Sequence, residues 1–254
     1  MLVLILALLA GCVPSLIVFF WFRNFLNKEN ALYKKNCDRM LVSGFLTTFP
    51  VILFSGCTAI LFNALGVKSS HPLLYAALHA FITLALSEEL SKYYMFRRKL
   101  KKIGGEHSWL DLTVYSTIVG LGFGLLESMV YVLESNPVIM LIRGISIPHG
   151  GYAAIVGYFY GKSVKENNKG YAVLGVLISL LLHGLYDFSL TEEIETITDA
   201  SGFIAVILAV LDLVIIIALI IFIRKNKNNT KYTEPLLQKG RLSPLVSQQR
   251  HTDP

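Results

Sequence analysis

Seven apolar stretches, each about as long as a bilayer is thick, constrain this chain more than any other feature of its sequence. A helix that crosses a membrane needs about 20 mostly apolar residues, and runs of that length recur from the start of the chain to residue 223. Backbone polar groups find no water inside a bilayer, so such runs are stable only as helices. The sequence therefore predicts an all-α fold, a polytopic membrane helical bundle of about seven transmembrane helices.

The composition agrees with a membrane protein. Of the 254 residues, 54% are hydrophobic and only 16% are charged, and the mean hydropathy is +0.58, which excludes an ordinary soluble globule. The three cysteines, Cys12, Cys37 and Cys57, are odd in number and lack metal-type spacing, so they imply no disulfide framework. Nucleic acid is not an expected partner, because the basic residues lie at predicted membrane edges, where anionic lipid explains them.

The apolar runs divide the chain into a bundle and a tail. The predicted helices span about 2–22, 40–65, 72–96, 109–133, 138–160, 171–190 and 202–223. The first run could be a signal peptide, but no Lys or Arg precedes it, so we expect a retained helix. Residues 1–223 are thus expected to form the bundle. Residues 224–254 are polar with little apolar periodicity, and are predicted to be a disordered cytoplasmic tail.

Loop charges predict the orientation. The connections Arg23–Arg39, Arg97–Lys102 and Lys162–Lys169 are basic, and so is the start of the tail, whereas the connection Thr191–Ser201 is acidic. Lys and Arg accumulate in cytoplasmic loops. The alternation therefore predicts a multi-pass protein of the cell membrane with its N-terminus outside and its C-terminus in the cytoplasm.

Two adjacent acids, Glu88 and Glu89, lie inside the third apolar run, and Lys92 follows Glu88 by one helical turn. A helix that ended early would leave this pair solvated, but Tyr93 and Tyr94 continue the run. An ionisable residue within a membrane segment is costly and is usually functional. We expect Lys92 to pair with Glu88, in the favourable order of such pairs, and to leave Glu89 freer.

The next three apolar runs also carry ionisable groups. Glu127 lies beside a ridge of small residues with Tyr131 one turn further on, and His149 is followed by the small residues Ala153 and Gly157. His183 and Asp187 are four residues apart and so share a helix face. His71 and His79 have no comparable polar neighbours, and we interpret them as structural.

Ionisable groups on four successive helices predict one shared polar site that holds Glu88, Glu89, Glu127, His149, His183 and Asp187. Carboxylate and imidazole suit a divalent metal, above all zinc, with Glu127, His149 and His183 as the expected ligands. The same groups suit a metal-free mechanism in which a glutamate activates water. One difficulty is depth, because helical rise puts Glu88 about 12 Å and Glu127 about 24 Å from the cytoplasmic side.

These motifs resemble the PrsW family of intramembrane proteases, relatives of the CAAX-protease and bacteriocin-processing enzymes. The resemblance rests on Glu88-Glu89-x-x-Lys92, on Glu127-x-x-x-Tyr131, on Arg143 with Pro148-His149, and on His183-x-x-x-Asp187. All four motifs stand in family order on successive runs. Leu126 departs from the phenylalanine usual in the family before this glutamate.

The resemblance implies a peptidase that hydrolyses a membrane-bound protein substrate in regulated intramembrane proteolysis. In characterised relatives that substrate is an anti-sigma factor. Two other classes of protein also place polar groups in the membrane. A secondary transporter would usually show an internal repeat, which the sequence lacks. A non-catalytic scaffold subunit would not need the Glu88–Glu89 pair.

Overall fold

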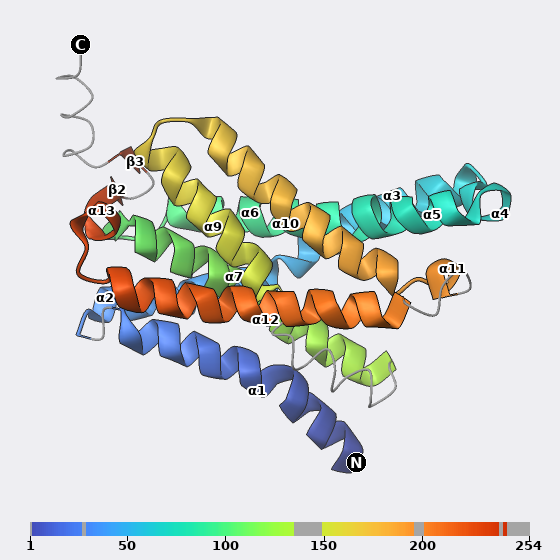
Figure 1. Ribbon diagram of the computed structural model, residues 1–254, viewed down its shortest axis with the longest axis horizontal. Coiled ribbons are helices and arrows are strands. Elements are labelled where there is room, and N and C mark those ends of the chain that lie inside the picture. The colour runs from blue at the N-terminus through green and yellow to red at the C-terminus, as the bar shows by residue number, and fades with distance from the viewer. Residues whose placement is uncertain (1, 27–28, 135–148, 196–200, 239–240, 243–254) are drawn as a thin grey trace.

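The computed structural model describes residues 2–26, 29–134, 149–195, 201–238 and 241–242, and Figure 1 shows them as long helices with a short sheet at one end. The longer α-helices are α1 (Leu2–Phe25), α2 (Ala31–Leu46), α3 (Thr48–Ala64), α6 (Ser87–Leu100), α7 (Trp109–Glu134), α9 (Gly150–Lys165), α10 (Lys169–Ser189) and α12 (Ser201–Asn226). The shorter elements are α4 (Val67–Ser70), α5 (Pro72–Leu78), the π-helix η1 (His79–Leu86), α11 (Glu192–Glu195), α13 (Thr230–Thr233), β1 (Glu106–Ser108), β2 (Pro235–Gln238) and β3 (Arg241–Leu242).

The predicted membrane bundle is confirmed. Among the described residues, five helical stretches are long and apolar enough to cross a membrane. They are Ala31–Ala64, Pro72–Leu100, Trp109–Val130, Lys169–Ser189 and Gly202–Asn226. A shorter apolar helix covers Gly11–Phe25. With α9, these are seven helical rods in the order that the apolar runs predict, and the molecule is an all-α membrane protein.

Helix α7 is the centre of the bundle, because almost all of its apolar stretch is buried. It packs against α9 through positions that only small residues can occupy. A Cβ atom at Gly157 would lie 2.6 Å from the Ser116 side chain, and one at Gly120 would lie 2.6 Å from the Cβ of Ala153. On the other side of α7, a Cβ at Gly44 would lie 2.3 Å from the Val119 carbonyl oxygen. The small residues therefore let three backbones approach closely, as in other membrane bundles.

The helix boundaries differ from the predicted ones for local reasons. The run predicted as 40–65 begins at Ala31, where the Asn30 side chain caps α2 by accepting from the Tyr33 N–H, and it breaks at Thr47 between α2 and α3. The third helix continues to Leu100 and contains the π-helix η1 directly before the acids. The fifth helix is described only from Gly150, and the predicted residues 138–148 lie outside the described part of the chain.

The basic connections lie at one end of the bundle. The side chain of Asn36 donates to the Gly104 carbonyl at 2.8 Å, which joins the first and third connections. Lys165 Nζ lies 2.5 Å from Glu234 Oε1, which joins the fifth connection to the tail. Figure 1 shows these segments together with α13, β1 and β2 at the left. This arrangement is the one that alternating loop charges require.

The described part of the tail forms regular elements. Helix α12 continues to Asn226, and β2 pairs antiparallel with β1, with Leu237 opposite His107. Pairing buries Leu236 and Leu237, an apolar pair whose burial favours order. Disorder was expected from residue 224, whereas residues 224–238 include the end of α12, α13 and β2; residues 243–254 lie outside the described part.

Candidate functional site

Helices α6, α7 and α10 and the start of α9 bring ionisable side chains into one buried cluster. Its innermost members are almost wholly shielded from solvent: Glu88, Glu89, Lys92, His149 and His183. The π-helix η1 immediately precedes these acids, and π-helical turns are frequent at functional sites. Aromatic rings enclose the cluster, with Phe123 edge-on to His149 at 4.9 Å between centroids.

Glu89 is held by three partners. Lys92 Nζ lies 2.6 Å from Glu89 Oε1, His183 Nδ1 lies 2.9 Å from the same oxygen, and the Ser179 hydroxyl donates to Oε2 at 2.7 Å. Lys92 is farther from Glu88, at 3.6 Å. The expectation that Lys92 pairs mainly with Glu88 is therefore wrong, because helical geometry also allows the i,i+3 pair. Both oxygens of Glu89 are thus occupied by contacts within the cluster.

His149 caps the start of α9 in a left-handed conformation with φ 69°. Its Nε2 lies 2.5 Å from Glu127 Oε2, and its Nδ1 lies 3.1 Å from Lys92 Nζ. A lysine ammonium has donors and no acceptor, so Nδ1 is the acceptor and Nε2–H donates to Glu127. His149 therefore presents a lone pair on Nδ1 to the interior of the cluster. It was predicted inside a helix, but its left-handed backbone is incompatible with a right-handed helix, and α9 begins only after it, at Gly150.

Glu88 faces both histidines. Its Oε2 is buried and has no hydrogen-bond partner among the described residues, although it lies 3.6 Å from His149 Nδ1 and 3.7 Å from His183 Nε2. A buried carboxylate oxygen is costly unless it is paired. A water or a metal ion that bridges Glu88 Oε2 to the two ring nitrogens would remove this cost.

The donor set fits a divalent metal. The ligand atoms of Glu88, His149 and His183 all lie within 4.8 Å of one another. Zinc bonds of about 2.0–2.1 Å in tetrahedral geometry place neighbouring ligand atoms about 3.4 Å apart, close to the observed separations. Each histidine also has a carboxylate on its other nitrogen, Glu127 for His149 and Glu89 for His183, as metal-binding histidines usually do.

All six predicted site residues meet in this cluster. Asp187 lies one turn from His183 on α10, with Oδ2 3.3 Å from His183 Nε2. Glu127, expected to be a metal ligand, contacts the far nitrogen of His149, and Glu88 takes its place beside the two rings. Two residues of the motifs, Arg143 and Pro148, lie outside the described residues, as does the side chain of Tyr131.

Sequence reasoning missed two polar contributors. Ser179 is a hydroxyl on the apolar face of α10, a pattern with no functional signal. Asp212 is buried in α12, and neither of its carboxylate oxygens has a hydrogen-bond partner among the described residues. The sequence could have singled out Asp212, because it is the only acid between Gly202 and Asn226, in the most apolar of the candidate membrane spans. His79, interpreted as structural, stacks on Tyr75 at 5.7 Å.

The close contact of α7 with His149 leads to a prediction. A Cβ at Gly120 would lie 2.3 Å from the His149 carbonyl oxygen. We expect Gly120→Ala to destabilise the protein by about 1–3 kcal/mol, as overpacking does, and to reduce activity by moving His149. Gly56→Ala in α3 is the control, because nothing lies within 4 Å of its Cβ position. Thermal unfolding of both variants in detergent is the measurement, and equal stability of the two would contradict the prediction.

Comparisons with known proteins point in one direction. The family model described as "PrsW family intramembrane metalloprotease" matches residues 35–220. A protein named Protease PrsW from Clostridioides difficile is 31% identical over 198 residues, or 73% of this chain and 79% of that relative. Protease PrsW from Halalkalibacterium halodurans is 28% identical over 187 residues, which cover 71% of this chain and 81% of the relative. No solved structure matches the chain significantly.

Proposed function

Because this chain belongs to the PrsW family of intramembrane metalloproteases and is therefore a peptidase, we propose that it cuts a membrane-bound protein at the cluster around Glu88. The observation that carries this proposal is Glu88 Oε2, which is buried without a hydrogen bond and faces a ring nitrogen of each histidine. The substrate is a single-pass membrane protein of the anti-sigma factor class, cut in regulated proteolytic signalling. This last step follows from the family resemblance alone.

The chain's own residues perform the proton transfers. Glu88 takes a proton from a water between the two imidazoles, and the water oxygen forms a bond to the carbonyl carbon of the scissile peptide. Glu88 then gives that proton to the leaving nitrogen as the C–N bond breaks, so that an acid and an amine result. Without a metal, a His183 ring that carries a proton on both nitrogens would stabilise the negative charge that develops on the carbonyl oxygen, and Asp187 would orient that ring.

A divalent metal would be held by His149 Nδ1 and His183 Nε2, and zinc suits these donors. Glu88 lies close enough to be its third ligand through one oxygen, which would leave the other oxygen to take the proton from water. When bound, it supplies Lewis acidity, which activates the attacking water and polarises the scissile carbonyl. In this arrangement Lys92 would keep its short contact to Glu89 and would give up its contact to His149 Nδ1, whose lone pair the metal would take. Glu127 and Glu89 orient the two rings.

Metal removal tests this assignment. We expect the purified protein in proteoliposomes to cleave a single-pass substrate, to lose most of that activity after dialysis against a chelator, and to regain it when zinc is restored. The control is the His183→Ala variant, which should stay inactive when zinc is added. Full activity of a chain shown by elemental analysis to be free of metal would refute the metal-dependent reaction and favour the glutamate mechanism without metal.

The orientation is part of the proposal. Basic connections at one end of the bundle support an N-terminus outside and a C-terminus in the cytoplasm. In a background without the exposed Cys57, we expect Lys101→Cys to resist an impermeant thiol reagent in intact cells and to react after permeabilisation. Lys68→Cys, exposed at the opposite end of the third rod, should react in intact cells. Labelling of Lys101→Cys but not of Lys68→Cys in intact cells would show the reverse orientation.

A further inference from the structure

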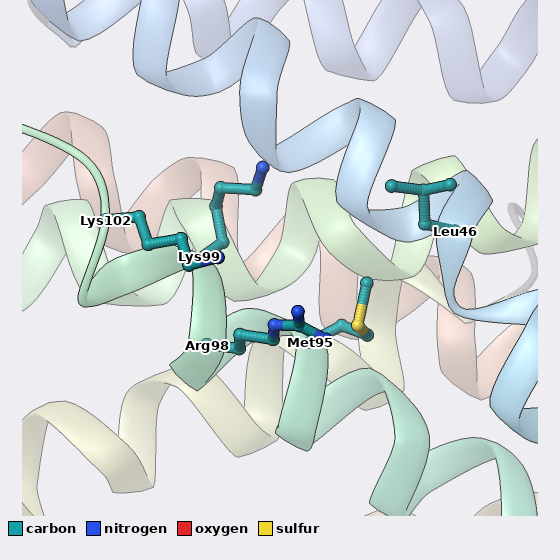
Figure 2. Close-up of a pocket in the computed structure, with 5 residues that line it drawn as sticks. All are labelled: Leu46, Met95, Arg98, Lys99 and Lys102. Carbon is teal, nitrogen blue, oxygen red and sulfur yellow. The ribbon is translucent and has the colours of Figure 1, made fainter.

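A cavity of about 220 Å³ lies between α2 and the C-terminal end of α6. It is lined by Leu46, Met95, Arg98, Lys99 and Lys102. Figure 2 shows Leu46 at one end of the cavity, Lys99 and Lys102 toward the other, and Met95 and Arg98 between them. The cavity is separate from the Glu88 cluster, and nothing in the proposed reaction uses it.

The cationic end of this cavity has no acid of its own. No ion pair of Arg98, Lys99 or Lys102 occurs among the residues that the structure describes. The electrostatic neighbours of Lys99 are Lys102, Arg39 and Arg98, all positively charged. Because like charges repel, an anion from outside the chain would stabilise this cluster.

The other end is apolar and faces outward. Leu46, Val42 and Phe49 are 42%, 52% and 72% exposed, and all three belong to the stretch Ala31–Ala64 that is apolar enough to cross a membrane. In a bilayer, lipid chains cover such a face. One cavity thus joins a surface that meets acyl chains to a cluster that attracts an anion.

We propose that this cavity binds the headgroup of an anionic phospholipid, with the phosphate at Arg98, Lys99 and Lys102 and the glycerol and acyl chains along Met95 and Leu46. The cavity has an apolar end and a cationic end, which match the acyl chains and the phosphate of a phospholipid. An acidic peptide would gain no binding energy from the apolar end. Arg98 lies ten residues after Glu88 on α6, or about 15 Å along the helix. A bound lipid therefore fixes the depth of the helix that carries the catalytic acid.

Native mass spectrometry of the full chain released from mixed bilayers tests the site. We expect the wild type to retain phosphatidylglycerol in preference to phosphatidylcholine, and Lys99→Gln/Lys102→Gln to bind it more weakly, roughly fivefold for each charge removed. The matched control is Lys101→Gln/Lys225→Gln, which removes the same charge. Lys101 lines a neighbouring cavity, and Lys225 is exposed at the end of α12.

Further arms separate lipid from other anions. Leu46→Asn should weaken phosphatidylglycerol binding and leave inorganic phosphate binding unchanged, because only the lipid touches the apolar end. Equal losses in the pocket and control variants would overturn the proposal in favour of diffuse surface charge. So would binding of inorganic phosphate or of an acidic peptide as tight as that of the lipid. These readouts do not depend on peptidase activity.

A second, independent observation concerns Asp212, whose carboxylate lies against the first turn of α9. A Cβ at Gly151 would lie 2.2 Å from Asp212 Oδ1. The N-cap residue His149 makes no side-chain capping bond to this helix, so among the described residues the free N–H groups of its first turn are not capped by the residue that precedes them. Tyr152, the next residue of that turn, stacks on His183 at 5.3 Å between centroids.

We infer that Asp212 is a positioning residue, and this rests on the proposed function of His149 and His183. A carboxylate near a helix N-terminus is stabilising. From α12, Asp212 therefore holds the turn that fixes the left-handed His149 and the stacked Tyr152. It acts through these residues and touches neither the substrate nor the reacting atoms.

Zinc affinity, measured by competition with a chelator, and the separate values of kcat and KM test this role. We expect Asp212→Asn to weaken zinc binding and to lower kcat, each by about tenfold or more, as loss of supporting residues does, with KM nearly unchanged. Asp212→Glu should restore part of both, and remains informative if the amide does not fold. Unchanged zinc affinity in a folded Asp212→Asn protein would reject the inference. If the wild type binds zinc and cleaves nothing, the proposed function fails while the affinity comparison still decides the role of Asp212.

Discussion

Glu88→Gln is expected to abolish peptide hydrolysis while leaving the bundle folded. The amide is nearly isosteric but cannot take a proton from water, and loss of a general base typically lowers the rate by a factor of about 10² to 10⁴. Glu88 Oε2 has no hydrogen bond to lose among the described residues, and its ion pair with Lys92 is long, at 3.6 Å, so the substitution removes little structural support. The measurement is the initial rate of substrate cleavage in proteoliposomes, with thermal unfolding of the same preparation.

Glu89→Gln is the informative comparison, because the two acids are neighbours with different surroundings. Glu89 contacts Lys92, His183 and Ser179, so its neutralisation should lower stability as well as activity. The prediction for Glu88 is wrong if the Gln variant keeps more than about a tenth of wild-type turnover, or if it unfolds as easily as the Glu89 variant. Either result would make Glu88 a structural acid.

The sequence predicted the bundle well because the bilayer leaves few alternatives. Apolar runs of about 20 residues can cross it only as helices, and loop charge orders their ends. The strand in the tail was not expected from the sequence, because Leu236 and Leu237 form too short an apolar pair to stand out. Their burial against β1 depends on a distant segment, which periodicity within the tail cannot reveal.

The membership of the site could be predicted, but the role of each member could not. Helical rise predicted different membrane depths for Glu88 and Glu127, and two features of the structure explain how both still belong to one cluster. Helix α6 continues to Leu100, which puts Glu88 deeper than expected, and the ring of His149 bridges the two acids. That bridge depends on a left-handed residue outside any helix, which no helical spacing indicates.

The choice between Glu88 and Glu89 was likewise beyond the sequence. Lys92 follows Glu88 by four residues and Glu89 by three, and both spacings allow a contact. Ser179 and His183 distinguish the two acids, because both contact Glu89 from α10. Their position depends on how α10 packs against α6, and tertiary packing cannot be inferred from the spacing within one helix. For Asp212 the difficulty was different. A lone acid in the most apolar helix can be found in the sequence, but no motif surrounds it that would assign it a role.

The buried pair of Lys92 and Glu89 is expected to be strongly coupled. Both side chains are at most 3% exposed, and their charged atoms lie 2.6 Å apart. Removing one partner of such a pair leaves a buried charge uncompensated, which typically costs about 3–5 kcal/mol. We therefore expect Lys92→Met to lower the free energy of unfolding by about that amount, and Glu89→Gln to lower it by less, because Lys92 also reaches Glu88 at 3.6 Å.

A double-mutant cycle isolates this coupling, measured by equilibrium unfolding in mixed detergent micelles. Lys92→Met/Glu89→Gln should destabilise the protein by less than the sum of the single variants, with an interaction energy of about 1–3 kcal/mol. The matched control is Lys162 in the last turn of α9 with the C-cap residue Glu166, a pair with the i,i+4 spacing, at 3.9 Å and with side chains 30% and 44% exposed. Exposed pairs contribute about 0.2–1 kcal/mol, so the control cycle should be nearly additive. Additivity in both cycles would mean that Lys92 does not compensate Glu89, and that His183 and Ser179 alone keep this acid buried.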